Sequence, residues 1–220
     1  TCIGFVDAVI ADHCADARHI LAESELSADD FSLFVAQHDI APYLSWRLNT
    51  TGGFALLPAW IRISLMAFQR RDKEHREQLL NGLQEISAAA DRAGLNFLLL
   101  KGPGLSQRYF NSLEARRICD LDLLAPPSQA PALASLLEEQ GYQGKAQSVY
   151  PRKWTEHFVH AKEFANPQYS IDLHTSIRVR PAYQINRHTI WQDCQTDIIN
   201  GTAVQTPSDQ HNLLILLLSI

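Results

Sequence analysis

One short stretch constrains this chain more than any other: Cys119-Asp120-Leu121-Asp122-Leu123-Leu124, in which two aspartates alternate with leucines. Side chains along a β-strand alternate between its two faces, so Asp120 and Asp122 share one face and the leucines between them share the other. Two carboxylates side by side on one face repel each other and lose hydration when the strand is packed. A divalent cation such as Mg²⁺ resolves this conflict, since it binds carboxylate oxygens and keeps positions for phosphate oxygens. The stretch therefore indicates a strand that holds a metal ion.

A third carboxylate follows in a later strand-like run, Ile171-Asp172-Leu173-His174. If the two strands are neighbours, Asp120, Asp122 and Asp172 converge on one spot. Three carboxylates that hold two metal ions are typical of in-line phosphoryl or nucleotidyl transfer, in which the ions activate a hydroxyl and neutralise the departing pyrophosphate. The structural alternative is that Asp172 ends a strand while the other two carboxylates lie in a solvated turn. His174 shares the face of Asp172 and either contacts a nucleotide or acceptor, or bonds to a neighbouring strand.

Composition is typical of a soluble globular chain of one or two domains, with 220 residues of which 46% are hydrophobic and 20% charged. The net charge of −5, without a basic tail, argues against a general nucleic-acid binder. Residues 101–180 carry ten Lys/Arg against eight Asp/Glu, a balance that suits a small anionic ligand. We find no signal peptide, no membrane-spanning run and no disulfide-type cysteine spacing, so we expect a cytoplasmic protein with reduced thiols and no membrane partner.

The spacing of apolar residues predicts three parts. A helical region covers residues 1–88, with helices near residues 5–23, 27–37, 42–50 and 58–94, the last of which extends into the following part. The central part, residues 89–205, has helices near 104–110 and 128–141 and strands near 95–100, 120–124, 142–149, 158–164, 169–173 and 203–205. Residues 206–220 start another helix and stop within its apolar run, as expected of a fragment of a longer protein. The predicted fold class is α+β, with the chemistry in the central part.

Five motifs occur in a fixed order: Leu99-Leu100-Lys101-Gly102, Arg116-Arg117, Asp120-Leu121-Asp122-Leu123-Leu124, Gly141-Tyr142 and Ile171-Asp172-Leu173-His174. Together they resemble the uncharacterised nucleotidyltransferase family of the DNA polymerase beta superfamily. The superfamily pattern is an apolar strand with a glycine turn, then an acidic-x-acidic strand, then a third acidic residue on a later strand. The resemblance covers about residues 90–215 and implies a nucleotidyltransferase-like mixed β-sheet core with helices.

The resemblance also implies roles for individual residues. Asp120, Asp122 and Asp172 would be catalytic and would hold Mg²⁺ or Mn²⁺, and Asp172 would also deprotonate the acceptor hydroxyl. The residues implied in nucleotide binding either offset phosphate charge or let the backbone approach the triphosphate, and they are Lys101, Gly102, Arg116, Arg117 and His174.

The activity that the resemblance implies is metal-dependent transfer of an NMP, such as AMP, from an NTP to a hydroxyl-type acceptor, with release of pyrophosphate. The acceptor is left open between protein, RNA and small molecule. One alternative is a catalytically degenerate nucleotide-binding or protein-interaction module of the same fold. Pro103 favours it, because proline has no N–H for a phosphate and would move the anion site to Gly104 and Leu105. A second alternative is a zinc-type hydrolase that uses His157, His160 and His174.

The other conspicuous side chains are expected to be structural. Cys119 precedes Asp120 on the opposite face of the predicted strand, so we expect a small core residue there and not a nucleophile. The charged run of residues 70–77 in the long helix is typical of a solvated face. Aromatic packing is the expected role of Trp46, Trp60, Trp154 and Trp191.

Overall fold

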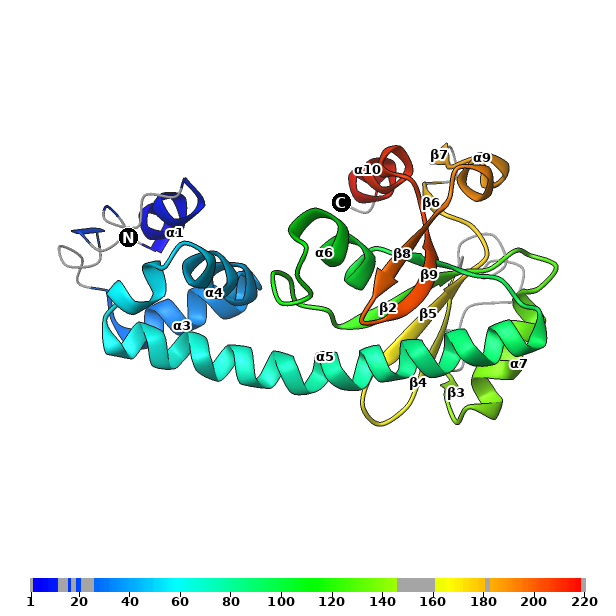
Figure 1. Cartoon of the computed structure of the whole chain (residues 1–220), viewed down its shortest axis with the longest axis horizontal. Helices are drawn as coiled ribbons and strands as arrows, with labels where there is room; N and C mark the ends of the chain where they lie inside the picture. The colour runs from blue at the N-terminus through cyan, green and yellow to red at the C-terminus, as the bar shows by residue number, and fades with distance from the viewer. Residues whose placement is uncertain are drawn as a thin grey trace. The chain divides into compact units, whose positions relative to one another are not determined.

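The computed structural model describes residues 2–11, 16, 19–20, 26–145, 161–180 and 183–218. The chain divides into two compact units, the first formed by Thr1–Glu74 with Phe110–Arg117 and the second by His75–Tyr109 with Ile118–Ile220. The long helix α5 (Ala59–Ala93) contributes to both units (Figure 1). Within the described ranges, no helix has the length and apolar character needed to cross a membrane.

The first unit is built from short helices around an apolar core. Its elements are α1 (Cys2–Ile10), α3 (Ala28–Gln37), α4 (Ala41–Thr50), the 3-10 helix η1 (Gly53–Leu56) and the first part of α5. Ser27 caps α3, because its hydroxyl accepts a hydrogen bond from the Asp30 N–H. In the core, Phe31 packs edge-on against Phe5 and Trp60. The helices predicted from apolar spacing near residues 27–37 and 42–50 are confirmed.

The second unit contains a five-stranded mixed sheet with the order β1-β2-β5-β4-β3. The strands in that order are β1 (Leu98–Leu100), β2 (Asp120–Leu124), β5 (Ser170–His174), β4 (Ala161–Ala165) and β3 (Gln143–Gly144). Strands β2 and β5 run parallel, and the other neighbours in this sheet pair antiparallel. This arrangement confirms the predicted α+β class with a mixed sheet core.

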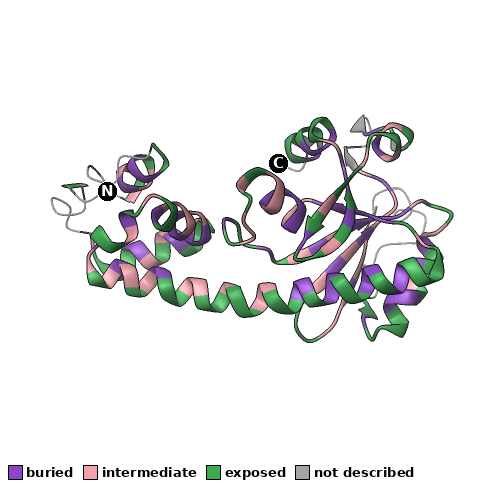
Figure 2. Cartoon of the chain, in the orientation of Figure 1, coloured by how far each residue is buried: buried purple, intermediate pink, exposed green. Residues whose placement is uncertain are grey.

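Two helices cover one face of this sheet, namely the second part of α5 and α7 (Ala130–Glu139) (Figure 1). The approach of α5 is close because Gly82 has no side chain: a Cβ atom there would lie 1.5 Å from the Tyr169 hydroxyl. Figure 2 shows buried residues along this part of α5, which include Leu79, Leu83, Ile86 and Ala90. The apolar positions of the predicted long helix therefore form part of the core under the sheet.

Other elements cover the opposite face: α6 (Gly102–Phe110), α9 (Arg187–Gln192), α10 (Asp209–Leu218) and the hairpin of β8 (Gln195–Ile199) and β9 (Thr202–Thr206). A separate two-stranded sheet is formed by β6 (Arg178–Arg180) and β7 (Tyr183–Gln184). One apolar cluster joins this face of the sheet to the covering elements and contains Leu98, Leu100, Leu124, Ile185, Ile190 and Ile215. The sequence predicts β9 and α10 but misses β6, β7, α9 and β8, whose short segments carry little apolar periodicity.

Several expectations about single residues can be checked directly. Cys119 is exposed, contrary to the core position expected from strand alternation, because β2 begins only at Asp120. The charged run is solvated as expected, with residues 70–77 exposed or partly exposed. The described tryptophans pack as expected: Trp46 against Phe110, Trp60 against Phe31 and Trp191 on the apolar cluster around Leu98. Trp154 lies outside the described residues.

Candidate active site

The register between two parallel strands brings the predicted carboxylates together. Asp122 on β2 pairs with Asp172 on β5, and Asp120 pairs with Ser170 two residues earlier. Because paired residues of neighbouring strands point to the same side of a sheet, Asp122 and Asp172 lie next to each other on one face. The intervening Leu121 and Leu123 are fully buried on the other face. The alternation predicted from the sequence is therefore confirmed.

His174 completes this group. Its Nε2 atom lies 2.8 Å from Oδ1 of Asp122, and the two side chains are only 20% and 13% exposed. The ligand atoms of Asp122, Asp172 and His174 all lie within 4.8 Å of one another, and we call these three residues the Asp–Asp–His cluster. Asp120 is not a member of it. The sequence left two roles open for His174, a contact with nucleotide or acceptor and a bond to a neighbouring strand. The structure shows the second, and the partner on β2 is Asp122, a predicted metal ligand.

The electrostatics of the cluster favour a bound cation. Burial raises the pKa of Asp172 above its usual range, and the nearby charge of Asp122 raises it further. Glu163 on β4 acts in the same direction, whereas His174 and Lys101 act in the opposite direction. The positive groups of the protein therefore do not fully compensate the paired carboxylates. Two carboxylate oxygens and an imidazole nitrogen at this spacing fit a divalent cation, which would supply the missing positive charge.

A turn with unusual backbone conformation lies beside the cluster. Leu100 pairs with Asp122, so Lys101 directly follows the residue opposite that carboxylate. Lys101 and Gly102 both adopt positive φ angles, +48° and +34°. The turn is also close to β2, because a Cβ atom on Gly102 would lie 3.7 Å from the Asp120 carbonyl oxygen. The glycine turn implied by the family resemblance is thus present at the edge of the acidic face.

Helix α6 starts at this turn and limits which amides could meet a phosphate. Pro103 has no N–H, and the N–H of Leu105 donates to the Lys101 carbonyl at 3.2 Å. Leu105 is therefore not the anion donor that the sequence suggested. The amides that the first turn of α6 can offer belong to Gly102 and Gly104, since the first N–H groups of a helix have no partner within it.

The remaining predicted site residues lie in the first unit or outside the described residues. Arg116 and Arg117 belong to the first unit, where Arg117 forms ion pairs with Asp39 at 2.7 Å and Asp72 at 3.7 Å. Their proposed contact with phosphate stays a prediction. His157 and His160, the other members of the zinc-type alternative, lie outside the described residues.

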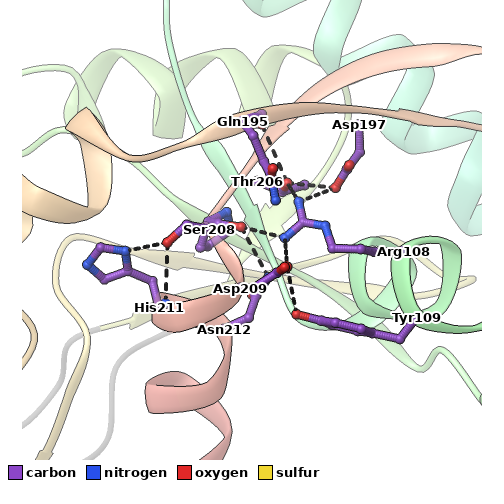
Figure 3. Close-up of polar contacts among 10 residues, drawn as sticks. Arg108, Tyr109, Gln195, Asp197, Thr206, Ser208, Asp209, His211 and Asn212 are labelled. Carbon is purple, nitrogen blue, oxygen red and sulfur yellow. Dashed lines mark hydrogen bonds and ion pairs between the residues drawn. The ribbon is translucent and has the colours of Figure 1, made fainter.

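Sequence reasoning missed a polar network that fixes α6 (Figure 3). The guanidinium group of Arg108 donates to Asp197 and Thr206 of the β8–β9 hairpin, to the Pro207 carbonyl at 2.7 Å and to Asp209 of α10 at 3.3 Å. The Arg108 side chain is only 12% exposed. One arginine therefore connects the helix that starts at the glycine turn with the hairpin and α10. Its partners are about 90–100 residues away in the sequence, so no local pattern predicts it.

A known protein family matches most of the chain. The sequence profile of a family described as "Uncharacterised nucleotidyltransferase" matches residues 24–219, which extends the resemblance into the helices before residue 90. No curated protein sequence matches the chain.

Similar solved structures share little sequence with the chain. The antibiotic-resistance factor ANT(2'')-Ia is 17% identical, with a TM-score of 0.42, over 60% of this chain and 65% of that one, just under two thirds of its length. The lincosamide antibiotic adenylyltransferase LnuA is 15% identical, with a TM-score of 0.44, over 60% and 82% of the two chains. A candidate nucleotidyltransferase from Thermotoga maritima is 14% identical, with a TM-score of 0.48, over 64% and 84%.

Proposed function

Because the chain belongs to the family of uncharacterised nucleotidyltransferases, we propose that its Asp–Asp–His cluster is the centre of a metal-dependent nucleotidyl transfer. The observation that carries this proposal is the pairing of Asp122 with Asp172 on parallel strands, beside a glycine turn. The reaction is the transfer of an NMP, such as AMP, from an NTP to a hydroxyl-type acceptor. We expect it in the cytoplasm, where NTPs and divalent cations are available.

The proposed metal site uses carboxylates of β2 and β5. Asp122 and Asp172 hold Mg²⁺ or Mn²⁺, and Asp120 is proposed to contribute from the position next to Ser170. A bound divalent ion supplies positive charge that makes the acceptor hydroxyl more acidic and stabilises the departing pyrophosphate. The raised pKa of Asp172 supports this assignment, since a nearby cation would offset the burial and the repulsion from Asp122 that raise it.

A carboxylate of the same site accepts the proton of the acceptor hydroxyl. The acceptor oxygen attacks the α-phosphorus of the NTP, the bond from that phosphorus to the bridging oxygen breaks, and pyrophosphate leaves. The hydroxyl proton passes to a carboxylate oxygen of Asp172. Asp172 is proposed as the general base because its carboxylate lies beside Asp122 in the proposed metal site, where the acceptor hydroxyl would be activated.

Binding of the triphosphate is assigned to the glycine turn. Lys101 offsets phosphate charge, and the amides of Gly102 and Gly104 at the first turn of α6 donate to phosphate oxygens. Arg116 and Arg117 are proposed as further cationic contacts. The acceptor is a protein, an RNA or a small molecule.

The test is release of pyrophosphate from each of the four NTPs, with Mg²⁺ or Mn²⁺ and with cell extract as a mixed source of acceptors. Asp122→Asn removes one carboxylate charge from the cluster. Glu139→Gln makes the same charge change at an exposed position of α7 and serves as the matched control. The proposal predicts release by the wild type and by Glu139→Gln, and loss of release in Asp122→Asn.

A second function is favoured by one observation: Pro103 takes away an amide at the first turn of α6. In that case the chain is a nucleotide-binding module without turnover. Metal-dependent NTP binding by the wild type without any pyrophosphate release would support this alternative and overturn the transferase.

A further inference from the structure

The donor atom that accompanies Asp122 and Asp172 is a nitrogen. His174 follows Asp172 by two residues on β5 and therefore lies on the same face of the sheet. Its Nε2 atom is 2.8 Å from Asp122 Oδ1, so this ring nitrogen is the one turned toward the carboxylates. Asp120, the other carboxylate of β2, lies outside the group whose ligand atoms are within 4.8 Å of one another. The described residues thus offer two oxygens and one imidazole nitrogen to a single ion.

This donor set discriminates between metals. Mg²⁺ is a hard ion that takes oxygen ligands in near-ideal octahedral geometry and retains several waters. Imidazole nitrogen binds first-row transition metals better than it binds Mg²⁺, while carboxylates and water also suit Mn²⁺. An ion held by carboxylates and one imidazole therefore gains from the nitrogen if it is Mn²⁺ and gains little if it is Mg²⁺.

We propose that on metal binding His174 Nε2 exchanges its hydrogen bond to Asp122 for coordination of the ion, with the imidazole proton on Nδ1, and that the site is consequently selective for Mn²⁺ over Mg²⁺. This inference rests on the proposed function and states which of its two proposed ions, Mn²⁺ or Mg²⁺, the site prefers. His174 then contacts the ion, whereas the sequence left open a contact with the nucleotide or acceptor, or a bond to a neighbouring strand.

The experiment reads the metal environment directly. Wild-type protein is loaded with Mn²⁺, and pulsed electron paramagnetic resonance measures nitrogen hyperfine coupling to the bound ion, which arises when an imidazole nitrogen is a ligand. A titration of the free-ion signal gives the dissociation constant of Mn²⁺. Competition with Mg²⁺ then gives the dissociation constant of Mg²⁺. The variants are His174→Gln and, as matched control, His188→Gln, which changes an exposed histidine on α9 outside the cluster.

The inference predicts nitrogen coupling from a single imidazole in the wild type and in His188→Gln, and none in His174→Gln. It also predicts that His174→Gln weakens Mn²⁺ binding by at least the roughly 10–100-fold that the loss of an outer partner of a metal ligand costs, while Mg²⁺ binding changes much less. The wild-type spectrum does not depend on any variant folding. Circular dichroism shows whether His174→Gln is folded.

Two results would overturn the inference, and they differ in what they mean for the transferase. Bound Mn²⁺ without nitrogen coupling, together with pyrophosphate release, would limit His174 to orienting Asp122 and leave the proposed function intact. If wild-type protein bound neither Mn²⁺ nor Mg²⁺, with or without nucleotide, the inference and the proposed function would both be wrong.

Discussion

Asp122 and Asp172 occupy directly paired positions on the parallel strands β2 and β5. Each is partly buried, and both lie on the face of the sheet that also carries His174. Two like charges at such positions destabilise the folded chain unless a cation joins them. Without a bound cation, the paired carboxylates therefore lower the free energy of unfolding, and this loss can be measured.

The first prediction concerns stability. In the absence of divalent ions at neutral pH, Asp172→Asn should be more stable than the wild type, because it removes one of the two repelling charges. An effect of about 1 kcal/mol would raise the melting temperature by roughly 2–4 °C for a chain of this size. Scanning calorimetry in the presence of a chelator measures it. Glu139→Gln, which loses a carboxylate at an exposed position, should leave the melting temperature unchanged.

The stability gain of Asp172→Asn should depend on pH. The folded state raises the pKa of Asp172, so the stability gained from protonating it is present below the ordinary aspartate pKa and is lost as pH rises through the raised value. The asparagine variant stays neutral and keeps that stability at neutral pH. The difference between the two proteins should therefore shrink toward acid pH. A difference that grew on acidification would contradict the assignment of repulsion to this pair.

The glycine turn gives a prediction with a matched control. Gly102 and Gly52 both have positive φ angles, and a Cβ atom would meet no clash at either position. Alanine at either position should therefore cost about 1 kcal/mol from backbone conformation alone. Only Gly102→Ala should also weaken NTP binding, since Gly52 is not among the residues proposed to contact the nucleotide. Isothermal titration with an NTP and metal separates the two effects, and equal affinities in both variants would argue against a phosphate contact at the turn.

Arg108 should be essential for the stability of the second unit. Arg108→Ala leaves the largely buried Asp197 without its cation, and breaking a buried pair in this way costs about 3–5 kcal/mol. Urea unfolding monitored in the second unit measures the loss. The double variant Arg108→Ala with Asp197→Asn should recover part of it, because no uncompensated charge remains. If the double variant were as unstable as the sum of the two single variants, the ion pair would not be the cause.

Gly82 provides a test of the packing between α5 and the sheet. Gly82→Ala would place a Cβ atom 1.5 Å from the Tyr169 hydroxyl, so either the Tyr169 side chain or the helix must shift. Overpacking of this kind costs about 1–3 kcal/mol, against a smaller gain from the better helix propensity of alanine. Chemical denaturation measures the net loss. Asn81→Ala, at an exposed position of the same helix, should not destabilise the protein.

The sequence predicts well those features that depend on local spacing. The alternation in Asp120-Leu121-Asp122-Leu123 predicts which side chains enter the core, and the apolar spacing of residues 58–94 predicts α5 within one residue at each end. The long-range features are different. Which of the two β2 carboxylates faces Asp172 depends on the register with β5, and a shift of two residues would exchange them.

Two contacts of the second unit lie beyond any local pattern. The bond between His174 and Asp122 joins residues 52 positions apart, and the Arg108 network joins α6 to a hairpin of which only the second strand was predicted. In both cases tertiary packing, and not local sequence, determines which residues come into contact. The prediction that Cys119 is a core residue is wrong for a simpler reason. It applies strand alternation to a residue that precedes β2, which begins at Asp120.

The most direct test of the central claim is to follow which phosphate of the NTP reaches the acceptor. Wild-type protein with Mn²⁺ or Mg²⁺ and cell extract is supplied with NTP labelled at the α-phosphate or at the γ-phosphate. Nucleotidyl transfer predicts label in the product from the α-position only, with the γ-label released as pyrophosphate, and loss of both signals in Asp122→Asn. Transfer of the γ-label to an acceptor, or undiminished α-label transfer by Asp122→Asn, would contradict the account.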